Sequence, residues 1–320
     1  MNGKHYKGHI AMLMANIIWG LNSPIGKAVL DSPYVTPLSL TTFRMVGAAI
    51  AFWAASLFTK KEHVKPEDLF MLFFAALFGI VLNQGSFIFG LSLTSPIDAS
   101  IVCTTTPIVT MIVAAIYLKE PVTGKKVLGI FIGAMGALIL ILSSQSAATG
   151  KSGSVWGDLL CLTAQISFAI YLTVFRNLIT KYSAITIMKW MFIYASICFI
   201  PFSYRDVASL EFARISTEVY AGIAFVVLGA TFLAYLLVMV GQKNLRPTLV
   251  SMYNYVQPIV ASAIAVAMGM DTFGWSKAGA IVLVFTGVYI VTQSKSKAQL
   301  DALKIKATDQ AAPGTPLTKN

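Results

Sequence analysis

The fold is decided by residues 69–91, which read LFMLFFAALFGIVLNQGSFIFGL, and by residues 220–242, which read YAGIAFVVLGATFLAYLLVMVGQ. Neither stretch contains a charged side chain. Each is longer than the roughly 20 apolar residues that an α-helix needs to cross a bilayer. The two stretches begin 151 residues apart. They predict membrane-spanning helices that occupy the same place in two similar halves of the chain.

Apolar runs of this kind continue along most of the chain. Of its 320 residues, 57% are hydrophobic and 12% are charged, whereas soluble proteins carry about 25% charged residues. The sequence therefore predicts an all-α membrane protein with ten transmembrane helices. The runs cover residues 10–30, 36–58, 69–91, 96–118, 127–142, 155–174, 185–204, 219–240, 247–268 and 278–292.

The basic residues indicate how the chain is oriented. With the N-terminus inside, 17 of the 24 Lys and Arg side chains fall in cytoplasmic segments, five fall on the opposite side, and two lie within helices. Cytoplasmic loops carry an excess of Lys and Arg. We therefore expect a multi-pass protein of the cytoplasmic (inner) membrane with both termini in the cytoplasm. The net charge of +11 reflects this topology, and no nucleic acid is expected as a partner.

Glycine, proline and serine residues recur at matching positions when the first half is shifted by 151 residues. Gly90 meets Gly241, Pro96 meets Pro247, Ser100 meets Ser251, Pro107 meets Pro258 and Gly136 meets Gly287. Each half contains five runs, so the second half enters the membrane from the opposite side. Inverted repeats of this kind are common in transporters. We expect two inverted five-helix repeats, residues 1–143 and 155–293, followed by a disordered cytoplasmic tail, residues 294–320.

The order of several motifs resembles the EamA-type family of the drug/metabolite transporter superfamily. The residues that carry the resemblance are Trp19-Gly20-Leu21-Asn22, Lys27, Ser32-Pro33, Arg44, Pro107, Tyr117-Leu118-Lys119-Glu120, and Gly129, Gly133 and Gly136. The resemblance covers residues 10–293. It implies ten helices, inverted five-helix repeats, and efflux or uptake of small metabolites, often amino acids. The second half departs from the pattern, because Phe168, Tyr171 and Asp271 replace the tryptophan, asparagine and glutamate.

Polar stripes on the fourth and ninth runs are the first candidates for a solute site. Their prolines, Pro107 and Pro258, remove backbone hydrogen bonds and are expected to act as hinges. Spacings of three, four and seven put polar side chains on one face of each helix. The candidate residues are Ser100, Thr104, Ser251, Asn254 and Tyr255. They either line a central cavity or join packed helices by hydrogen bonds.

Further candidates lie on the first, second, third, sixth and eighth runs. Amides, aromatic rings and one deep cation in apolar helices would suit a polar solute that has an apolar part. Packing and interhelical hydrogen bonding are the alternatives. The residues are Asn16, Trp19, Asn22, Arg44, Asn83, Gln84, Gln165, Tyr171 and Tyr235. Glu120 and Asp271 follow the fourth and ninth runs, and we expect them to cap the next helix.

The sequence therefore favours a secondary transporter with no cofactor and no metal. It moves small organic metabolites, with amino acids or related zwitterions as the best fit, in the direction of efflux, by alternating access through a central cavity. The acidic residues lie in loops, tails or outer helical turns, so no buried proton relay is expected. The expected partners are a small-molecule substrate and the lipid bilayer, with the protein as a monomer.

Two alternatives stay open. One is a solute channel. The other is a membrane-embedded enzyme, which would need a Ser/His pair, paired aspartates or metal ligands at depth. The sequence offers no such group there, so an enzyme is not expected.

Overall fold

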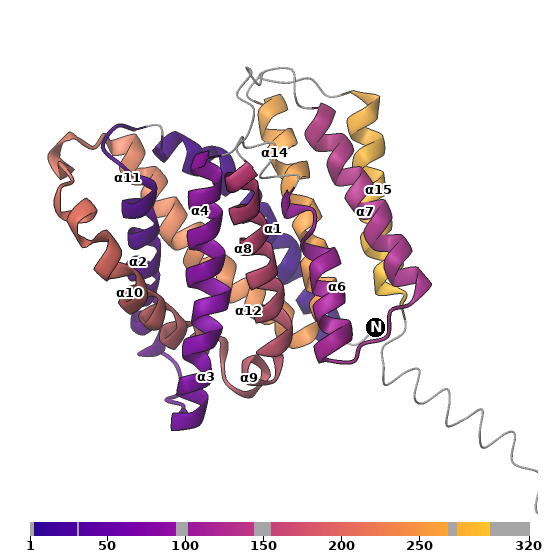
Figure 1. The fold of residues 1–320 in the computed structure, drawn as a ribbon, viewed down its shortest axis with the longest axis horizontal. Helices are drawn as coiled ribbons and strands as arrows, with labels where there is room; N and C mark the ends of the chain where they lie inside the picture. Colours follow the sequence, from indigo (N-terminus) through magenta and orange to yellow (C-terminus); the bar gives the residue numbers. More distant parts are fainter. Residues whose placement is uncertain (1–2, 31, 94–101, 144–154, 268–273, 295–320) are drawn as a thin grey trace, which may run out of the picture.

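In the computed structural model, the described residues are 3–30, 32–93, 102–143, 155–267 and 274–294. Within these ranges every regular element is helical (Figure 1). This confirms the all-α prediction. Three features named in the predictions lie outside the described residues: Ser100, Asp271 and the tail after Ser294.

The helices of the two halves follow the predicted runs closely. In the first half they are α1 (Gly3–Leu30), α2 (Pro37–Ser56), α3 (Pro66–Ala76), η1 (Leu77–Leu82), α4 (Asn83–Leu93), α6 (Thr106–Tyr117) and α7 (Gly124–Ser143). In the second half they are α8 (Val155–Val174), α9 (Arg176–Lys181), α10 (Ala184–Ala208), η3 (Phe212–Arg214), α11 (Thr217–Ala224), η4 (Phe225–Leu233), α12 (Ala234–Asn244), α13 (Pro247–Met252), η5 (Tyr253–Tyr255), α14 (Val256–Ala267) and α15 (Trp275–Thr292). Helices α7 and α15 begin three residues earlier than expected.

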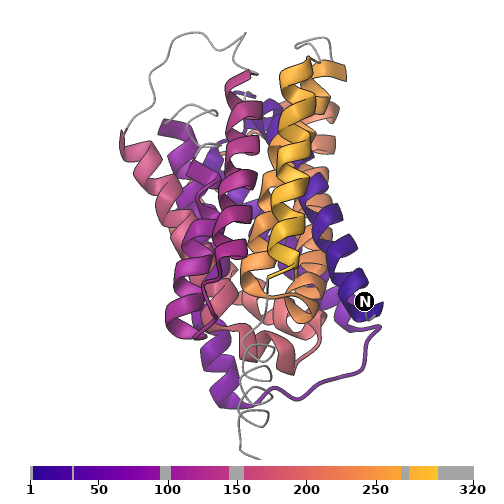
Figure 2. The ribbon, with the colours of Figure 1, turned by 90° about the vertical axis from the view of Figure 1, so that its right-hand side faces the viewer.

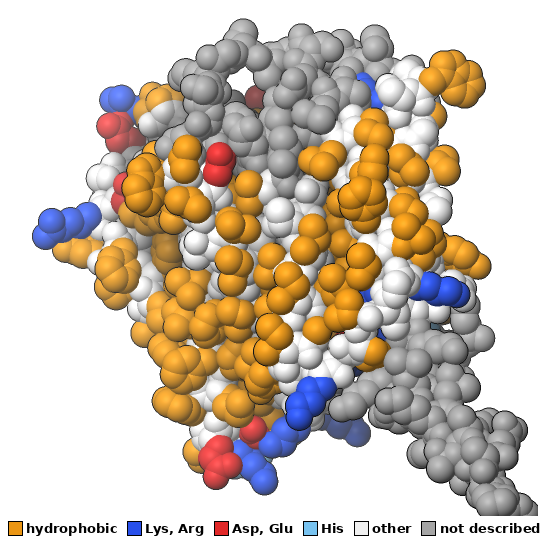
Figure 3. All heavy atoms as spheres, turned by 45° about the vertical axis from the view of Figure 1, so that its right-hand side comes forward, with side chains coloured by type: hydrophobic (Ala, Val, Ile, Leu, Met, Phe, Trp, Pro, Cys, Tyr) orange, Lys and Arg blue, Asp and Glu red, His pale blue; other side chains and the backbone are white. Residues whose placement is uncertain are grey.

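Six helical stretches among the described residues are long and apolar enough to cross a membrane. They are Pro37–Ser56, Pro66–Gly90, Val155–Val174, Ala184–Ala208, Thr217–Asn244 and Trp275–Thr292. Hydrophobic side chains cover the middle of the face drawn in Figure 3, and a group of Lys and Arg lies at its lower end. The chain is therefore built as a multi-pass membrane protein, and we call its Lys- and Arg-rich lower end the basic face.

Local sequence explains where several helices begin. The Thr36 hydroxyl accepts from the Ser39 amide at 3.1 Å, and the Ser39 hydroxyl accepts from the Thr36 amide at 3.0 Å. This reciprocal cap satisfies donors that a helix start leaves free. Pro37 follows at the first turn, where its missing amide hydrogen costs nothing. Ser183 and Ser216 cap α10 and α11 in a similar way.

Helical irregularities recur in the same register of both halves. Two wide π-type turns, η1 and η4, interrupt the helices that run from Pro66 and from Thr217. A shift of 151 residues places Leu77–Leu82 on residues 228–233, within η4. The fourth and ninth runs are interrupted at Thr104–Thr105 and at η5, shortly before Pro107 and Pro258. Such turns leave carbonyl groups free inside a helix and occur often at functional sites.

Helices from the two halves pack in pairs. Helix α2 lies against α10, and α7 lies against α15 (Figures 1 and 2). The second pair crosses through glycines: a methyl group on Gly287 would lie 2.5 Å from the carbonyl oxygen of Gly129. Small residues allow such close approach of membrane helices. Both ends of the described chain lie at the basic face, because His9 contacts Tyr253 and Arg246 contacts Ser294.

Candidate functional site

The centre of the molecule holds a cluster of aromatic and polar side chains around Tyr235 on α12. The Gln84 amide, from α4, donates to the Tyr235 hydroxyl at 2.6 Å. The Trp19 ring, from α1, lies edge-on to two other rings. Its centroid is 5.8 Å from that of Tyr235 and 6.3 Å from that of Phe168 on α8. Gln84 and Tyr235 are 151 residues apart, so equivalent positions of the two halves meet in this cluster.

The π-type turn η4 supplies partners to two of the predicted site residues. Trp19 Nε1 donates to the carbonyl oxygen of Ala230 at 2.9 Å. Arg44 Nε donates to the Thr231 hydroxyl at 3.0 Å, and that hydroxyl donates to the carbonyl oxygen of Val226 at 2.7 Å. The residues of η4 thus offer a backbone carbonyl to Trp19 and a side-chain hydroxyl to Arg44.

Arg44 brings a positive charge to the edge of this cluster. Its partner Thr231 directly follows Ala230, whose carbonyl oxygen accepts from Trp19. Within the described ranges, no ion pair joins Arg44 to a carboxylate. A buried charge inside a membrane normally faces the protein interior and finds a partner. Here its guanidinium is held by a neutral hydroxyl, so it can still attract an anionic group.

Two amide oxygens, one in the central cluster and one a helical turn from Trp19 on α1, are buried without a hydrogen-bond partner. They are Gln84 Oε1 and Asn22 Oδ1. Leaving a buried acceptor unsatisfied costs about 1–3 kcal/mol. Groups of this kind are therefore expected where a ligand supplies the missing donor. With Arg44, they offer acceptors for an ammonium group and a cation for a carboxylate.

The cluster is filled by its own side chains. Gln84, Phe168 and Tyr235 are each no more than 5% exposed. The central cavity predicted from the sequence therefore stays a prediction, since entry of a solute would require these groups to separate.

Other predicted site residues make hydrogen bonds between neighbouring helices. Asn83 donates to the carbonyl oxygen of Ala164 at 3.0 Å. Gln257 donates to Asn16 at 2.9 Å, and Thr106 donates to Gln165 at 2.7 Å. These contacts match the alternative that the sequence left open, polar bonding between helices.

The residues beside the helix breaks bond mainly to backbone. The Tyr255 hydroxyl lies 3.2 Å from the carbonyl oxygen of Thr104, again 151 residues away. Ser251 donates to the carbonyl oxygen of Thr248 at 2.9 Å. Asn254 lies half-buried within η5. Pro107 occupies the first turn of α6 and Pro258 the third position of α14. Their hinge role remains a prediction.

Tyr171 lies between the central cluster and the basic face. Its ring packs on Gly79 of η1, where an added methyl group would lie 2.7 Å away. Its hydroxyl lies 3.3 Å from Gln242 Oε1 and 3.4 Å from Met239 Sδ, both on α12. Tyr171 is fully buried and separates the central cluster from the end of α12.

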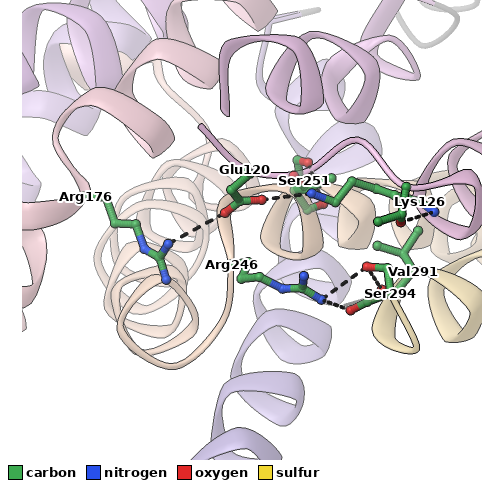
Figure 4. Close-up of polar contacts among 9 residues, drawn as sticks. Glu120, Lys126, Arg176, Arg246, Ser251, Val291 and Ser294 are labelled. Atoms are coloured by element: carbon green, nitrogen blue, oxygen red, sulfur yellow. Dashed lines mark hydrogen bonds and ion pairs between the residues drawn. The ribbon is translucent and has the colours of Figure 1, made fainter. Parts of the chain in front are cut away.

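Charged groups close the basic face below Tyr171. Figure 4 shows Glu120 between Lys126 and Arg176, at 2.9 and 3.7 Å, with Arg246 turned toward Ser294. Arg246 donates to the Ser294 carbonyl oxygen at 2.9 Å. Burial lowers the pKa of Arg246, and the nearby Glu120 carboxylate opposes that shift. Glu120 was expected to cap α7. Instead the Thr123 hydroxyl accepts a hydrogen bond from the Lys126 amide, and Glu120 forms ion pairs with side chains.

Sequence reasoning did not select Thr231, Gln257, Gln242 or Thr106, although all four bond to predicted residues. The 151-residue register could have identified Gln257 and Thr106, because positions 106 and 257 match. Thr231 matches Ile80, so the repeat carries no signal for it.

Comparisons with known proteins agree with this architecture. The uncharacterized transporter YyaM of Bacillus subtilis is 26% identical, over 92% of this chain and 99% of its own length. Protein WALLS ARE THIN 1 of Arabidopsis thaliana is 25% identical, over 95% of this chain and 87% of its own. A crystal structure of a protein with 16% identity superposes with a TM-score of 0.73, over 93% of this chain and 98% of that one, which shows a shared fold.

The match to a family is found twice along the chain. The sequence model of the EamA-like transporter family matches residues 6–142 and again residues 155–293. Together these ranges span both halves, including the central cluster and the basic face. The resemblance noted in the sequence is confirmed: this chain belongs to the EamA-like transporter family.

Proposed function

We propose that the protein is a secondary transporter that moves small zwitterionic metabolites, with amino acids as the best fit, across the cytoplasmic membrane in the direction of efflux. The observation that carries this proposal is the central cluster. Arg44, a deep cation, lies at its edge, and Gln84 Oε1 within it is an unpaired buried acceptor. A second unpaired acceptor, Asn22 Oδ1, lies one helical turn from Trp19 on α1. Membership of a transporter family favours this proposal over a membrane-embedded enzyme.

A zwitterion fits this arrangement better than a simple cation. Its carboxylate would bind Arg44, and its ammonium group would donate to the amide oxygens that lack partners. An apolar side chain would lie among Trp19, Phe168 and Tyr235, whose rings already contact one another. A quaternary ammonium compound has no carboxylate for Arg44 and no N–H donor for the amides.

The proposed mechanism is alternating access, in which a central site opens in turn to each side of the membrane. In this proposal ten transmembrane helices form two inverted repeats, and both termini lie in the cytoplasm. Contacts between positions 151 residues apart, Gln84 with Tyr235 and Thr104 with Tyr255, support a two-fold relation through the centre. The meeting of both chain ends at the basic face supports an even number of crossings. The functional unit that we propose is a monomer with its solute and the surrounding lipid.

The proposed transport is facilitative. Driving a solute with protons usually requires a buried acid whose pKa is tuned by its surroundings. Among the described residues the acids lie near helix ends or in connections, as with Asp68 at the start of α3 and Asp158 in the first turn of α8. The solute would therefore move down its own gradient.

Reconstitution and counterflow test this proposal. Liposomes preloaded with an unlabelled neutral amino acid should accumulate the labelled form transiently, since only a carrier shows trans-stimulation. Arg44→Gln should raise the KM for zwitterions at least about tenfold, whereas Arg44→Lys, which keeps the charge, should lie between that variant and the wild type. Uptake without trans-stimulation would favour the solute channel. Preference for quaternary ammonium compounds would refute the proposed substrate class.

A further inference from the structure

The basic face is held closed by contacts that converge on one short segment, residues 176–183. Three carboxylates of the first half bind it: Glu62 accepts from the Ser183 amide at 2.9 Å, Asp68 binds Lys181 and Tyr182, and Glu120 lies 3.7 Å from Arg176. The hydrogen bond to Asp68 raises the pKa of Lys181. The segment comprises α9 and its two following residues, and it connects α8 to α10. Three contacts between the two halves at this face therefore gather on residues 176–183, which we call the strap, while His9 contacts Tyr253 separately.

The contacts of Glu120 differ in kind. Its pair with Lys126 is short, at 2.9 Å, and joins residues six positions apart in the same half. Its pair with Arg176 is longer, at 3.7 Å, with a third of the Arg176 side chain exposed, and it crosses between the halves. Opening this face must break the Arg176 contact and can leave the Lys126 contact intact. Arg176 is thus the movable partner of Glu120.

Above this strap, Tyr171 forms a second layer. Tyr235, Met239 and Gln242 follow one another at spacings of four and three, so they share one face of α12. Tyr171 contacts the last two of these residues, and its ring is wedged against Gly79. This face of α12 leads from the central cluster toward Arg246, two residues past the end of the helix. The tyrosine therefore blocks the direct route along α12.

Buried polar atoms without partners accompany this route. They are Gln242 Nε2, Arg246 Nη1 and Thr248 Oγ1. Packing alone gives no reason to bury such atoms, because each one costs about 1–3 kcal/mol when it is unsatisfied. Their partners would be water or a polar solute in a state in which the route is open.

We propose that residues 176–183 and Tyr171 are the outer and inner layers of a gate on the basic face, and that a polar solute passes it along the Tyr235–Gln242 face of α12. This inference rests on the proposed function, because a gate is meaningful only if a solute crosses. The outer layer opens when Arg176 leaves Glu120. The inner layer opens when the Tyr171 ring leaves Gly79 and Gln242.

Thiol labelling from each side of the membrane tests both layers without any solute. Two probes are placed in a chain whose cysteines at 103, 161 and 198 are replaced by alanine. Thr248→Cys lies in α13, two residues beyond Arg246, where Thr248 is 1% exposed, and Gln84→Cys lies in the central cluster. A membrane-impermeant thiol reagent is applied to sealed vesicles of both orientations, and the labelling rate is measured.

The two layers should respond separately. Arg176→Gln should speed labelling of Thr248→Cys from the basic face at least about tenfold, while Gln84→Cys stays slow from that face. Adding Tyr171→Ala to the Arg176→Gln variant should then speed labelling of Gln84→Cys from the basic face by a similar factor. Arg176→Lys keeps the charge and should restore slow labelling. Lys126→Gln is the matched control, since it removes the other cation on Glu120, and it should leave both labelling rates within about twofold.

Each contrary result identifies what failed. If Lys126→Gln and Arg176→Gln accelerate labelling equally, any disturbance of the ion cluster loosens this face. That result would refute the specific role of residues 176–183. Exposure of Gln84→Cys by Arg176→Gln alone would overturn the inner layer. If labelling behaves as expected but no solute shows counterflow, the proposed function fails while the two-layer closure stands.

Discussion

The glycine crossing of α7 and α15 gives the sharpest prediction for stability. A methyl group on Gly287 would lie 2.5 Å from the Gly129 carbonyl oxygen, 2.6 Å from the Gly133 nitrogen and 2.8 Å from the Gly133 Cα. All three are backbone atoms, so no side-chain rotation relieves the contact. Ordinary contact begins at 3.4 Å, which requires the helices to move apart by about 0.9 Å at this point.

We expect Gly287→Ala to lower the free energy of unfolding by about 1–3 kcal/mol, the usual cost of inserting a methyl group into a tightly packed interface. Gly279→Ala is the matched control. It lies on the same helix, nothing is within 4 Å of its added methyl group, and alanine favours a helix over glycine by up to about 1 kcal/mol. That variant should be neutral or slightly more stable.

Unfolding by SDS in mixed micelles is the suitable assay, because it separates packed membrane helices while retaining much of their helical structure. The difference between the two variants is the quantity of interest, since both make the same chemical change. If Gly287→Ala and Gly279→Ala unfold within about 0.5 kcal/mol of each other, the close crossing of α7 and α15 is refuted.

Three further predictions address the centre and the topology. Gln84→Leu combined with Tyr235→Phe should destabilise the protein less than the sum of the single changes, with a coupling of about 0.6–1.7 kcal/mol in an unfolding double-mutant cycle; additive effects would contradict the 2.6 Å bond. A pH gradient alone should drive no uphill accumulation of amino acid in liposomes, because no deep carboxylate is found among the described residues; accumulation would rule out facilitative transport. Reporter fusions to the two ends of the chain should both be cytoplasmic, and an external C-terminal reporter would exclude ten crossings.

The membrane class and the helix positions could be predicted from local sequence. In lipid, backbone groups must bond within their own helix, so each crossing needs an apolar run of about 20 residues, and such runs are visible without tertiary information. Residues 155–174 illustrate this, because α8 spans Val155–Val174 as predicted. Proline chemistry likewise indicated the interruptions before Pro107 and Pro258.

The repeat register carried information about contacts as well as about helices. Gln84 and Tyr235 occupy equivalent positions under the shift of 151 residues, and the fold brings them within hydrogen-bond distance. A register found in the sequence can therefore indicate which side chains meet at the centre. The same reasoning applies to Thr104 and Tyr255.

The roles of individual polar residues were decided by the tertiary structure. Sequence spacing placed Asn83 and Gln84 together, but Asn83 bonds to the backbone of α8 whereas Gln84 turns to Tyr235 with one acceptor left unpaired. Arg44 bonds to the Thr231 hydroxyl of η4, and the Tyr171 ring packs where Gly79 has no side chain. A sequence fixes which side chains share a face of one helix through the 3.6-residue period. Which neighbouring helix that face meets depends on the rotation and depth at which whole helices pack, and these are set jointly by all the helices that contact one another.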